Sequence, residues 1–467
     1  MYLGGPGRNR TTDTRIFNPL LYRLSYQAKG RKYSKLIGIC KPPLHFLSSA
    51  PAIMIESSTI RLFVRRDFCM HLQSDICIIG NGAVGKTAAL GFAQLGLSVT
   101  LLGPSVAPST VTPNEDWDVR VFALNHVAQD LLSSLRVWDA LDASRVAAVD
   151  AMQVNGDGAE HAGHLGFDAY GARVGALTWI VEDRNLNQAL DAALKFAPKV
   201  RSVAGRATQL DGGRARALVQ LENGDTLEAA LLVGADGAQS WVRGQCDIDF
   251  DYRAYRQRAI VTNFACVKPH RGIAHQWFDP AQGIIALLPL PGQRVSLVWS
   301  APDHLAEVLM RESLTQLAAR LATWAGPVLG ELTPLQPEAV KAFPLRLIAP
   351  RAITAPRVAL IGDAAHVVHP LAGHGMNLGF GDVASLLKLV AGRGAERDCG
   401  DARVLSRYAR ARKEDILLMQ LATDGLQRLF SSDFEPLRVA RNIGLNLLDK
   451  LPVIKRRLIS QALGRSH

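Results

Sequence analysis

The chain has 467 residues, of which 48% are hydrophobic and 20% are charged, and its formal net charge is +11. This length suggests about two or three domains, and the composition excludes a disordered chain, a collagen and a small disulfide-stabilised protein. The six cysteines form no Cys-x-x-Cys pair, so the sequence predicts neither a zinc site nor a disulfide framework.

Residues 1–69 carry most of the positive charge, because they contain 12 Lys and Arg but only 3 Asp and Glu. Three interpretations of this basic leader remain open. It is an organellar transit peptide, which would place the protein in mitochondria, or a basic arm that binds polyanions, or a segment that is not made because translation begins at Met70. We favour the third, since Met70 shortly precedes the first predicted strand, Asp75–Ile79. The rest of the chain has a net charge of +2, which does not indicate a nucleic-acid partner.

A glycine-rich turn, Gly80–Thr87, follows this strand and precedes a predicted helix. It fits the dinucleotide-binding motif G-x-G-x-x-G. In that motif Gly80 allows the tight turn, Gly82 lets a pyrophosphate approach the backbone, and Gly85 lets the helix pack on the strand. The positive end of the helix would then face the phosphates.

The same turn also fits the P-loop motif, in which Lys86 would reach the outer phosphates and Thr87 would hold Mg²⁺. A dinucleotide site expects an acidic residue at the end of the second strand, Ser98–Leu102, but Gly103 stands there. A P-loop enzyme expects an apolar strand ending in an acidic residue, which Leu177–Asp183 could supply. At this point both interpretations stay open, and in the dinucleotide interpretation Lys86 is expected to be a solvated helix residue.

The middle of the chain, about 144–180 and 251–344, has a different pattern. Two strand-like runs, Gly283–Leu290 and Arg294–Ser300, are joined by Pro-Gly-Gln, which is typical of a hairpin. The sequence therefore predicts an antiparallel sheet here and helices from about residue 401 to the end.

Two later segments favour a flavin site. The strand in 231–243 ends in Asp236-Gly237, and the strand in 357–382 ends in Gly362-Asp363 before a loop that opens a helix. Asp363, at the end of its strand, can accept hydrogen bonds from ribityl or ribose hydroxyls. The glycines at the helix start let backbone N–H groups reach a ring, and the helix N-terminus would stabilise negative charge on a reduced flavin.

These three motifs, in this order across residues 75–400, resemble those of the class A flavoprotein monooxygenases, the para-hydroxybenzoate hydroxylase superfamily. Four further segments look like those of the ubiquinone-biosynthesis ring hydroxylases: 118–124, 179–186, 286–300 and 441–445. The similarity covers about 75–464. The sequence departs from the family at Gly103, at His374 where Gln is common, and at Lys86 after the third glycine.

The resemblance implies an α/β fold: a Rossmann-like (GR2-type) FAD-binding domain with an inserted α+β substrate domain on an antiparallel sheet, and a helical C-terminal region. We expect the FAD-binding domain in 70–143, 181–250 and 345–400, the substrate domain in 144–180 and 251–344, and C-terminal helices in 401–467. It also implies the reaction: NADPH or NADH reduces FAD, and a flavin hydroperoxide formed with O2 hydroxylates a phenol. The cofactor carries this chemistry, so we assign no catalytic side chain and no metal.

The cofactor-binding residues that the resemblance implies come from all three motifs. Gly80, Gly82 and Gly85 would meet the pyrophosphate with Arg120 near it, and Asp363 would meet the ribityl or ribose. Asp236 and Arg243 are implicated in FAD and nicotinamide handling. The remaining expected residues lie near Asp363 or against the isoalloxazine ring: Gly362, Pro370, Gly373, Gly375, Met376 and Asn377.

Several of these side chains have a structural alternative. Arg120 could pair with Asp116 or Asp118, and Arg243 could cap a helix or pair with Asp247. The nearby His366 and His369 could relay protons, but we expect them to be structural.

The expected partners are O2 and a polyprenylated phenol, a ubiquinone precursor. Another aromatic substrate is the alternative within the family, and a P-loop nucleotide hydrolase is the alternative outside it.

No run of 18 apolar residues predicts a spanning helix. We expect a cytoplasmic enzyme. The basic amphipathic segment 442–463 could contact the inner membrane or dock on the body, and a ubiquinone-biosynthesis complex is a further possible partner.

Overall fold

The computed structural model describes residues 70–105, 117–156, 163–213, 215–336, 339–369 and 373–430. The leader, Pro370 and the segments 441–445 and 442–463 lie outside these residues. None of the described helices is long and apolar enough to cross a membrane.

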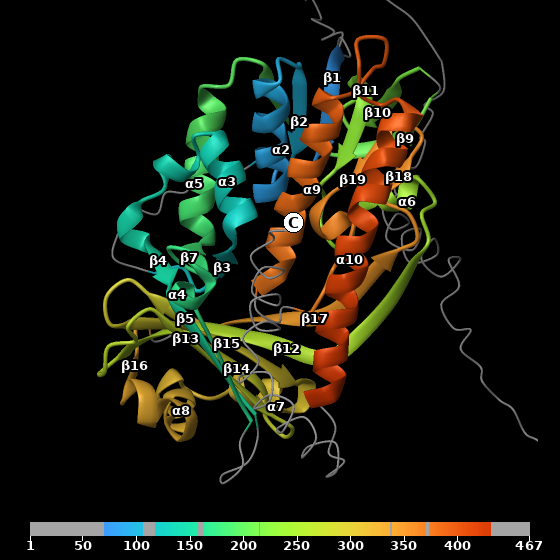
Figure 1. Ribbon diagram of the computed structural model, residues 1–467. Coiled ribbons are helices and arrows are strands. Elements are labelled where there is room, and N and C mark those ends of the chain that lie inside the picture. The colour runs from blue at the N-terminus through green and yellow to red at the C-terminus, as the bar shows by residue number, and fades with distance from the viewer. Residues whose placement is uncertain are drawn as a thin grey trace, which may run out of the picture. The chain divides into compact units, whose positions relative to one another are not determined.

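A mainly parallel sheet forms the upper part of the body in Figure 1. Its strands run in the order β18 (Thr354–Ala355), β19 (Val358–Leu360), β11 (Thr226–Gly234), β1 (His71–Ile79), β2 (Val99–Gly103) and β8 (Val200–Ala204), with β10 (Ala217–Leu221) and β9 (Ala207–Asp211) added beside β11. Strand β1 pairs in parallel with both β11 and β2. The predicted first and second strands are therefore confirmed. Both are rich in Ile, Leu and Val because they are covered on both faces.

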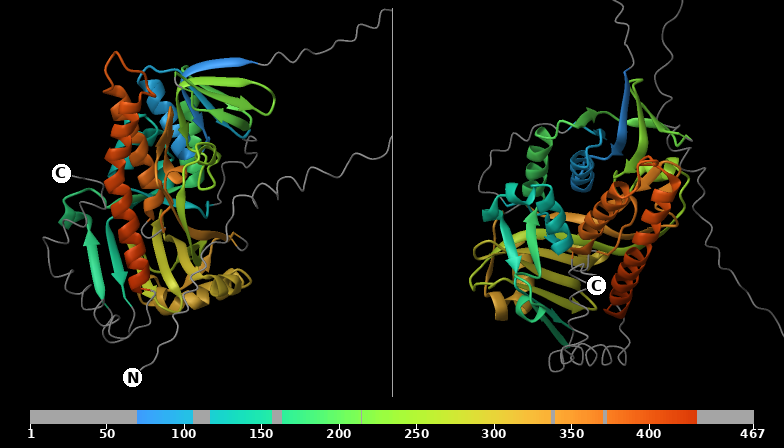
Figure 2. Two further views of the ribbon diagram at one scale, coloured as in Figure 1. Left: turned by 90° about the vertical axis from the view of Figure 1, so that its right-hand side faces the viewer. Right: turned by 45° about the horizontal axis from the view of Figure 1, so that its top comes forward.

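Helices pack on this sheet. Helix α9 (His374–Ala391) contacts both α2 (Ala83–Gln94) and α10 (Ala402–Phe430), and Figures 1 and 2 show the three helices along one face of the sheet. Helices α3 (His126–Ser134) and α5 (Asp183–Lys195) lie beside them. The apolar core under this sheet contains strand residues together with fully buried Phe92 of α2, Phe380 of α9 and Tyr408 of α10. Helix α10 confirms the predicted helical C-terminal region.

The second large sheet is the predicted antiparallel sheet. Its order is β16 (Leu332–Pro334), β12 (Phe250–Cys266), β15 (Arg294–Pro302), β14 (Gly283–Leu290), β13 (Ile273–Asp279), β5 (Ala151–Asn155) and β6 (His164–Asp168), and β17 (Lys341–Pro350) pairs with β12. Strands β14 and β15 form the predicted hairpin. Among the described strand pairs of this sheet, β5–β13 alone is parallel.

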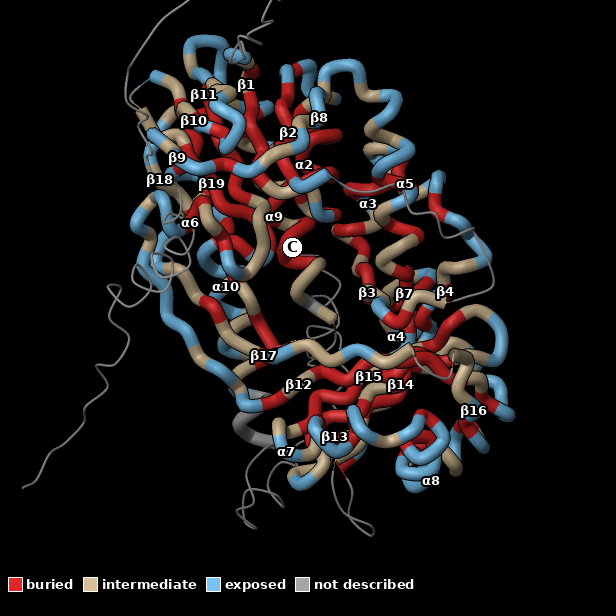
Figure 3. The backbone as a smooth tube through the Cα atoms, turned by 180° about the vertical axis from the view of Figure 1, so that it is seen from behind, coloured by how far each residue is buried: buried red, intermediate tan, exposed pale blue. Residues whose placement is uncertain are grey.

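Successive residues of these strands face opposite sides. The outward residues Ile285, Leu287, Leu297 and Trp299 pack under α7 (Asp303–Leu309) and α8 (Leu314–Leu329) in a second core. Figure 3 shows buried backbone in both large sheets. The inward face of the antiparallel sheet is therefore free to line a cavity.

A small third sheet, β3 (Val121–Leu124), β7 (Thr178–Glu182) and β4 (Val146–Val149), joins residues that the sequence had assigned to two domains. The expected domain boundaries stay a prediction. The remaining short elements are α4 (Ala169–Ala172), α6 (Trp241–Gln245), η1 (Trp138–Ala140), η2 (Ala143–Arg145) and η3 (Gly362–Ala364).

Candidate active site

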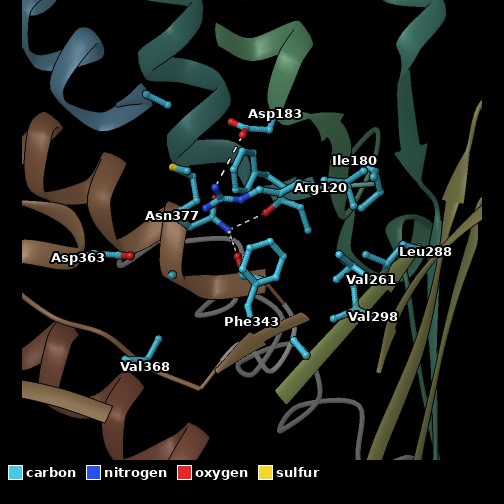
Figure 4. A pocket seen from close by; sticks show the side chains of 18 of the residues that line it. Arg120, Ile180, Asp183, Val261, Leu288, Val298, Phe343, Asp363, Val368 and Asn377 are labelled. Atoms are coloured by element: carbon cyan, nitrogen blue, oxygen red, sulfur yellow. Dashed lines mark hydrogen bonds and ion pairs between the residues drawn. The ribbon is translucent and has the colours of Figure 1, made fainter. Parts of the chain in front are cut away.

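A cavity of about 680 Å³ lies between the ends of the parallel strands and the inward face of the antiparallel sheet. The turns after β1, β11 and β19 contribute Gly82, Gly237 and Gly362 to its wall. Ligands of open α/β sheets bind at these carboxyl ends. Figure 4 shows how polar side chains gather at one end of the cavity and apolar ones at the other.

The three glycines after β1 have different roles, as the motif predicts. Gly80 has a φ of 114°, and a Cβ there would lie 2.2 Å from the Ala235 carbonyl oxygen. A Cβ at Gly85 would lie 1.9 Å from the Gly80 oxygen, so Gly85 is needed for helix packing. Gly82 instead faces open space and lines the cavity. Its backbone is where a pyrophosphate could approach.

Asp363 presents its carboxylate to the cavity (Figure 4). Gly362 before it has a φ of 59°, a conformation that glycine adopts without strain. Limited solvation in the enclosed site raises the pKa of Asp363, and the charges of His366, Arg120 and Arg346 partly offset this effect. No described residue donates a hydrogen bond to this carboxylate, so it is available to hydroxyl groups of a ligand.

The N-terminus of α9 points its first residues at the same space. Gly373, Gly375 and Met376 line the cavity, and Gly373 has a φ of 69°. The side chain of Asn377 accepts a hydrogen bond from the Asn125 N–H (2.9 Å) and donates one to the Ala123 carbonyl (2.8 Å). Asn377 therefore fastens α9 to the β3–α3 turn. The predicted Pro370 lies outside the described residues.

Arg120 reaches into the cavity from the residue before β3, and half of its side chain is exposed. Its guanidinium lies 3.7 Å from Asp183 and over the rings of Phe122 and Phe343, at 5.2 and 5.7 Å. Burial raises the pKa of Asp183, and Arg120 counteracts this increase. The sequence had suggested Asp116 or Asp118 as a partner. Asp116 lies outside the described residues, and the Asp118 carboxylate accepts the Arg120 backbone N–H instead.

Asp236 and Arg243, the charged residues of the second motif, make hydrogen bonds within the protein next to the cavity. Asp236 accepts hydrogen bonds from the Ser240 hydroxyl (2.6 Å) and the Val242 N–H (3.0 Å), at the start of α6. Buried Arg243 donates to the carbonyls of Ala364 and Ala238, each at 2.9 Å. It thus joins the second and third motifs, whereas the sequence had suggested an ion pair with Asp247 as its alternative role. Neither Asp236 nor Arg243 lines the cavity.

The P-loop hypothesis is wrong. Lys86 is 5% exposed and pairs with Asp191 of α5 (2.6 Å), so the expectation that it is solvated is wrong as well. The Thr87 hydroxyl is fully buried and donates to the Ala83 carbonyl. The strand expected to end in a metal-binding acid, β7, belongs to the small sheet and does not pair with β1.

The two histidines of the third motif have buried partners. His366 donates from Nε2 to Asp382 (2.6 Å), a fully buried residue of α9 that also accepts the Gly362 N–H and Arg412 Nε. His369 donates from Nε2 to Gln257 Oε1 (3.0 Å). Neither side chain lines the cavity, which fits the structural role that we expect for them.

The far end of the cavity is apolar. The inward face of the antiparallel sheet contributes mostly small side chains: Ala259, Val261, Ala274, Ala286, Leu288 and Val298. Met152, Phe167 and Leu177 continue this wall toward β5 and β6. Sequence reasoning identified the sheet but not these residues, although the period of two in β12, β14 and β15 is a signal that could have found them.

Fold and site together define a flavin-dependent oxidoreductase whose cavity has a polar, glycine-lined end and an apolar end. The chain belongs to the FAD binding domain family, whose pattern matches residues 73–416. The predicted family is thereby confirmed, and the residues at the polar end fit its cofactor: Gly82 leaves room for a pyrophosphate, and Asp363 faces the cavity without a donor among the described residues.

Curated proteins resemble the chain over most of their length. It is 35% identical to 3-demethoxyubiquinol 3-hydroxylase of Escherichia coli over 84% of this chain and 98% of that protein. It is 34% identical to ubiquinone hydroxylase UbiL of Rhodospirillum rubrum, over 84% and 90%. It is 31% identical to the human mitochondrial ubiquinone biosynthesis monooxygenase COQ6, over 83% and 92%.

Solved structures show the same fold. PqsL of Pseudomonas aeruginosa, in complex with 2-aminobenzoylacetate, matches 80% of this chain and 100% of its own with a TM-score of 0.66 and 22% identity. The p-nitrophenol 4-monooxygenase PnpA of Pseudomonas putida matches 85% of this chain over 100% of its own, with a TM-score of 0.65 and 18% identity.

Proposed function

We propose that this protein is an FAD-dependent monooxygenase that hydroxylates the aromatic ring of a polyprenylated phenol in ubiquinone biosynthesis, with NADPH or NADH as reductant and O2 as the oxygen source. The observation that carries the proposal is a cavity that has a polar, glycine-lined end and an apolar sheet wall. The relatives named for ubiquinone hydroxylation support the substrate class.

At the polar end, this chain's own residues would bind and orient the cofactor. Gly82 and the α2 N-terminus would receive the pyrophosphate, and Asp363 would accept hydrogen bonds from ribityl hydroxyls. The N-terminus of α9 would stabilise negative charge near the ring. When bound, FAD supplies the transfer of electrons from the nicotinamide and of one oxygen atom to the substrate.

At the apolar end, the residues would exclude water and hold the substrate. Alanine, valine and leucine side chains offer no hydrogen bonds, and the isoprenoid chain of such a phenol needs none, so that chain would gain apolar contact there. The same wall would shield the reacting atoms from water. Peripheral membrane contact stays a prediction, because the segment expected to make it, 442–463, lies outside the described residues. Membership of a biosynthetic complex also stays a prediction.

The proposal is tested with purified protein. We expect a yellow flavin spectrum, and NADPH or NADH oxidation that a prenylated phenol stimulates with matching formation of a hydroxylated product. A protein that neither holds FAD nor recovers it on addition would overturn the flavoenzyme assignment. Hydroxylation of soluble phenols without activity on prenylated ones would overturn the substrate assignment and leave the alternative aromatic hydroxylase.

The biosynthetic role is tested in cells. In a strain lacking the gene, a quinone precursor should accumulate that lacks one ring hydroxyl, and the purified enzyme should hydroxylate that precursor. Unchanged quinone composition in the deletion strain would contradict the role in ubiquinone biosynthesis.

A further inference from the structure

Gly103 ends strand β2 at the position where dinucleotide-binding folds normally carry an acidic residue for a ribose hydroxyl. The backbone there is fixed on both sides. The Gly80 N–H donates to the Leu102 carbonyl (2.8 Å), and the Gly205 N–H donates to the Gly103 carbonyl (3.1 Å). A side chain at residue 103 would therefore leave the strand in one defined direction.

That direction is occupied by the side chain of Asn81. A Cβ on Gly103 would lie 2.3 Å from Asn81 Cγ, 2.6 Å from Oδ1 and 2.7 Å from Nδ2. Real Cβ atoms do not approach other atoms so closely. The Asn81 carboxamide thus fills the space in which an acidic side chain at residue 103 would begin.

The Asn81 carboxamide uses its Nδ2 group for a hydrogen bond within the protein, while its Oδ1 accepts none from a described residue. Asn81 Nδ2 donates to the Pro104 carbonyl (3.0 Å), which fixes the orientation of the amide. No described residue donates to Asn81 Oδ1, and the side chain is only partly buried. Asn81 is also the residue between Gly80 and Gly82, beside the open backbone that suits a pyrophosphate.

We propose that Asn81 replaces the missing acidic residue: its Oδ1 accepts a hydrogen bond from a hydroxyl of the adenosine ribose of FAD. The ribose contact then comes from the β1–α2 turn instead of the end of β2. It requires glycine at residue 103, because any side chain there would occupy the space of the Asn81 carboxamide. The uncharged Asn81 side chain, together with glycine at residue 103, thus takes the place of the carboxylate that dinucleotide-binding folds normally carry there. The inference rests on FAD binding and is independent of the aromatic substrate.

The test is a double-mutant cycle on the full-length protein from which flavin has been removed. FAD is titrated in, and Kd is measured from the quenching of flavin fluorescence. Asn81→Ala should raise the Kd for FAD about three- to tenfold, as expected for one hydrogen bond. Gly103→Ala should raise it by a similar factor, because the new methyl group displaces the carboxamide.

The two effects should not add. In Asn81→Ala the space beside residue 103 is empty, so Gly103→Ala should change Kd no further in that background. The double variant Asn81→Ala, Gly103→Glu should bring the Kd back to within about threefold of the wild-type value, since the carboxylate now has room to make the same bond. The matched control is Asn223→Ala, at an exposed turn where the amide bonds to Asp225.

FMN separates a ribose contact from a general distortion of the turn, because it lacks the adenosine. The Kd for FMN should be the same in the wild-type protein and all variants. Unchanged FAD binding in Asn81→Ala would overturn the proposal, as would an equal loss of FMN and FAD affinity, or additive effects of Asn81→Ala and Gly103→Ala. Thermal unfolding of each flavin-free variant shows that the compared proteins are folded.

Discussion

Arg243 shows how a residue of a cofactor motif can act without touching the cofactor cavity. Its guanidinium satisfies the carbonyls of Ala364 and Ala238 and lies 4.5 Å from the centre of the Phe250 ring. Replacement by Met would keep most of the apolar stem but leave the buried Ala364 carbonyl and the partly buried Ala238 carbonyl without this donor. Each lost partner costs roughly 1–3 kcal/mol, so we expect Arg243→Met to lower the free energy of unfolding by about 2–4 kcal/mol.

Urea denaturation of the flavin-free protein measures this change. The control is Arg136→Met, because Arg136 is 88% exposed and its pair with Asp139 is correspondingly weak. A stability loss in Arg243→Met no larger than in the control would contradict a bracing role for Arg243.

His369 makes a second prediction, which concerns pH. It is fully buried, and desolvation lowers its pKa from 6.5 to about 4. Between these two values the unfolded chain binds the proton and the folded protein does not. Stability therefore rises with pH across this window and is lost as the pH falls from about 6.5 to about 4.

Comparison of His369→Gln with the wild-type protein isolates this contribution. The wild type should lose about 2–3 kcal/mol more of its unfolding free energy than the variant between pH 7 and pH 4. The matched control is His304→Gln, which removes an exposed histidine. Parallel pH profiles for the wild type and His369→Gln would refute the prediction.

At the scale of elements, the buried carboxylate of Asp382 joins three pieces of structure. From α9 it accepts the Gly362 N–H of η3, the His366 side chain and Arg412 Nε of α10, at 2.9, 2.6 and 2.7 Å. His366 and Arg412 lower the pKa of Asp382 against the effect of burial, which alone would raise it. The position of the turn at Gly362 thus depends on α10, a helix that contributes no residue to the cavity wall.

Arg412→Met should therefore destabilise the protein by about 3 kcal/mol, since removal of one member of a buried ion pair leaves the other uncompensated. Hydrogen exchange should become faster in α10 and at the turn of Gly362. Arg410→Met, on an exposed position of the same helix, is the control. Faster exchange confined to α10 would contradict a link between this helix and the loop.

The sequence was sufficient for elements whose signal is local. Glycines at residues 80, 82 and 85 identified the strand, turn and helix, because all three lie in one turn: Gly80 and Gly85 leave no room for a Cβ, and Gly82 opens the backbone to the cavity. The hairpin of β14 and β15 was equally local. The burial of Lys86 was not predictable in this way, since its partner Asp191 lies on another helix more than 100 residues later. The pairing of Arg120 with Asp183 likewise depends on how β3 and α5 meet.

At the scale of the whole molecule, the cavity exists because two sheets of different kinds face one another. The parallel sheet brings three glycine-containing turns to one edge, and the antiparallel sheet offers one face to its own helices and the other to the cavity. Strand alternation therefore separates residues that stabilise the sheet from residues that line the cavity. A substitution on the inward face should change selectivity with little effect on cofactor binding.

Ala286→Phe tests this separation. Ala286 lines the cavity from β14, while its neighbours Ile285 and Leu287 are fully buried in the opposite core. A phenyl ring there would narrow the apolar end, and overpacking of that kind costs roughly 1–3 kcal/mol. We expect the KM for a prenylated phenol to rise about tenfold or more, with the Kd for FAD unchanged and a smaller effect on a phenol that lacks the prenyl chain.

Ala148→Phe places the same ring on an exposed residue of β4 and should leave all three constants unchanged. Steady-state kinetics with prenylated and unprenylated phenols provide the comparison. If Ala286→Phe raised the KM values for the prenylated and the unprenylated phenol equally, the inward sheet face would not hold the prenyl chain of the substrate. If it weakened FAD binding as well, the two ends of the cavity would not be separable in the way that the strand alternation indicates.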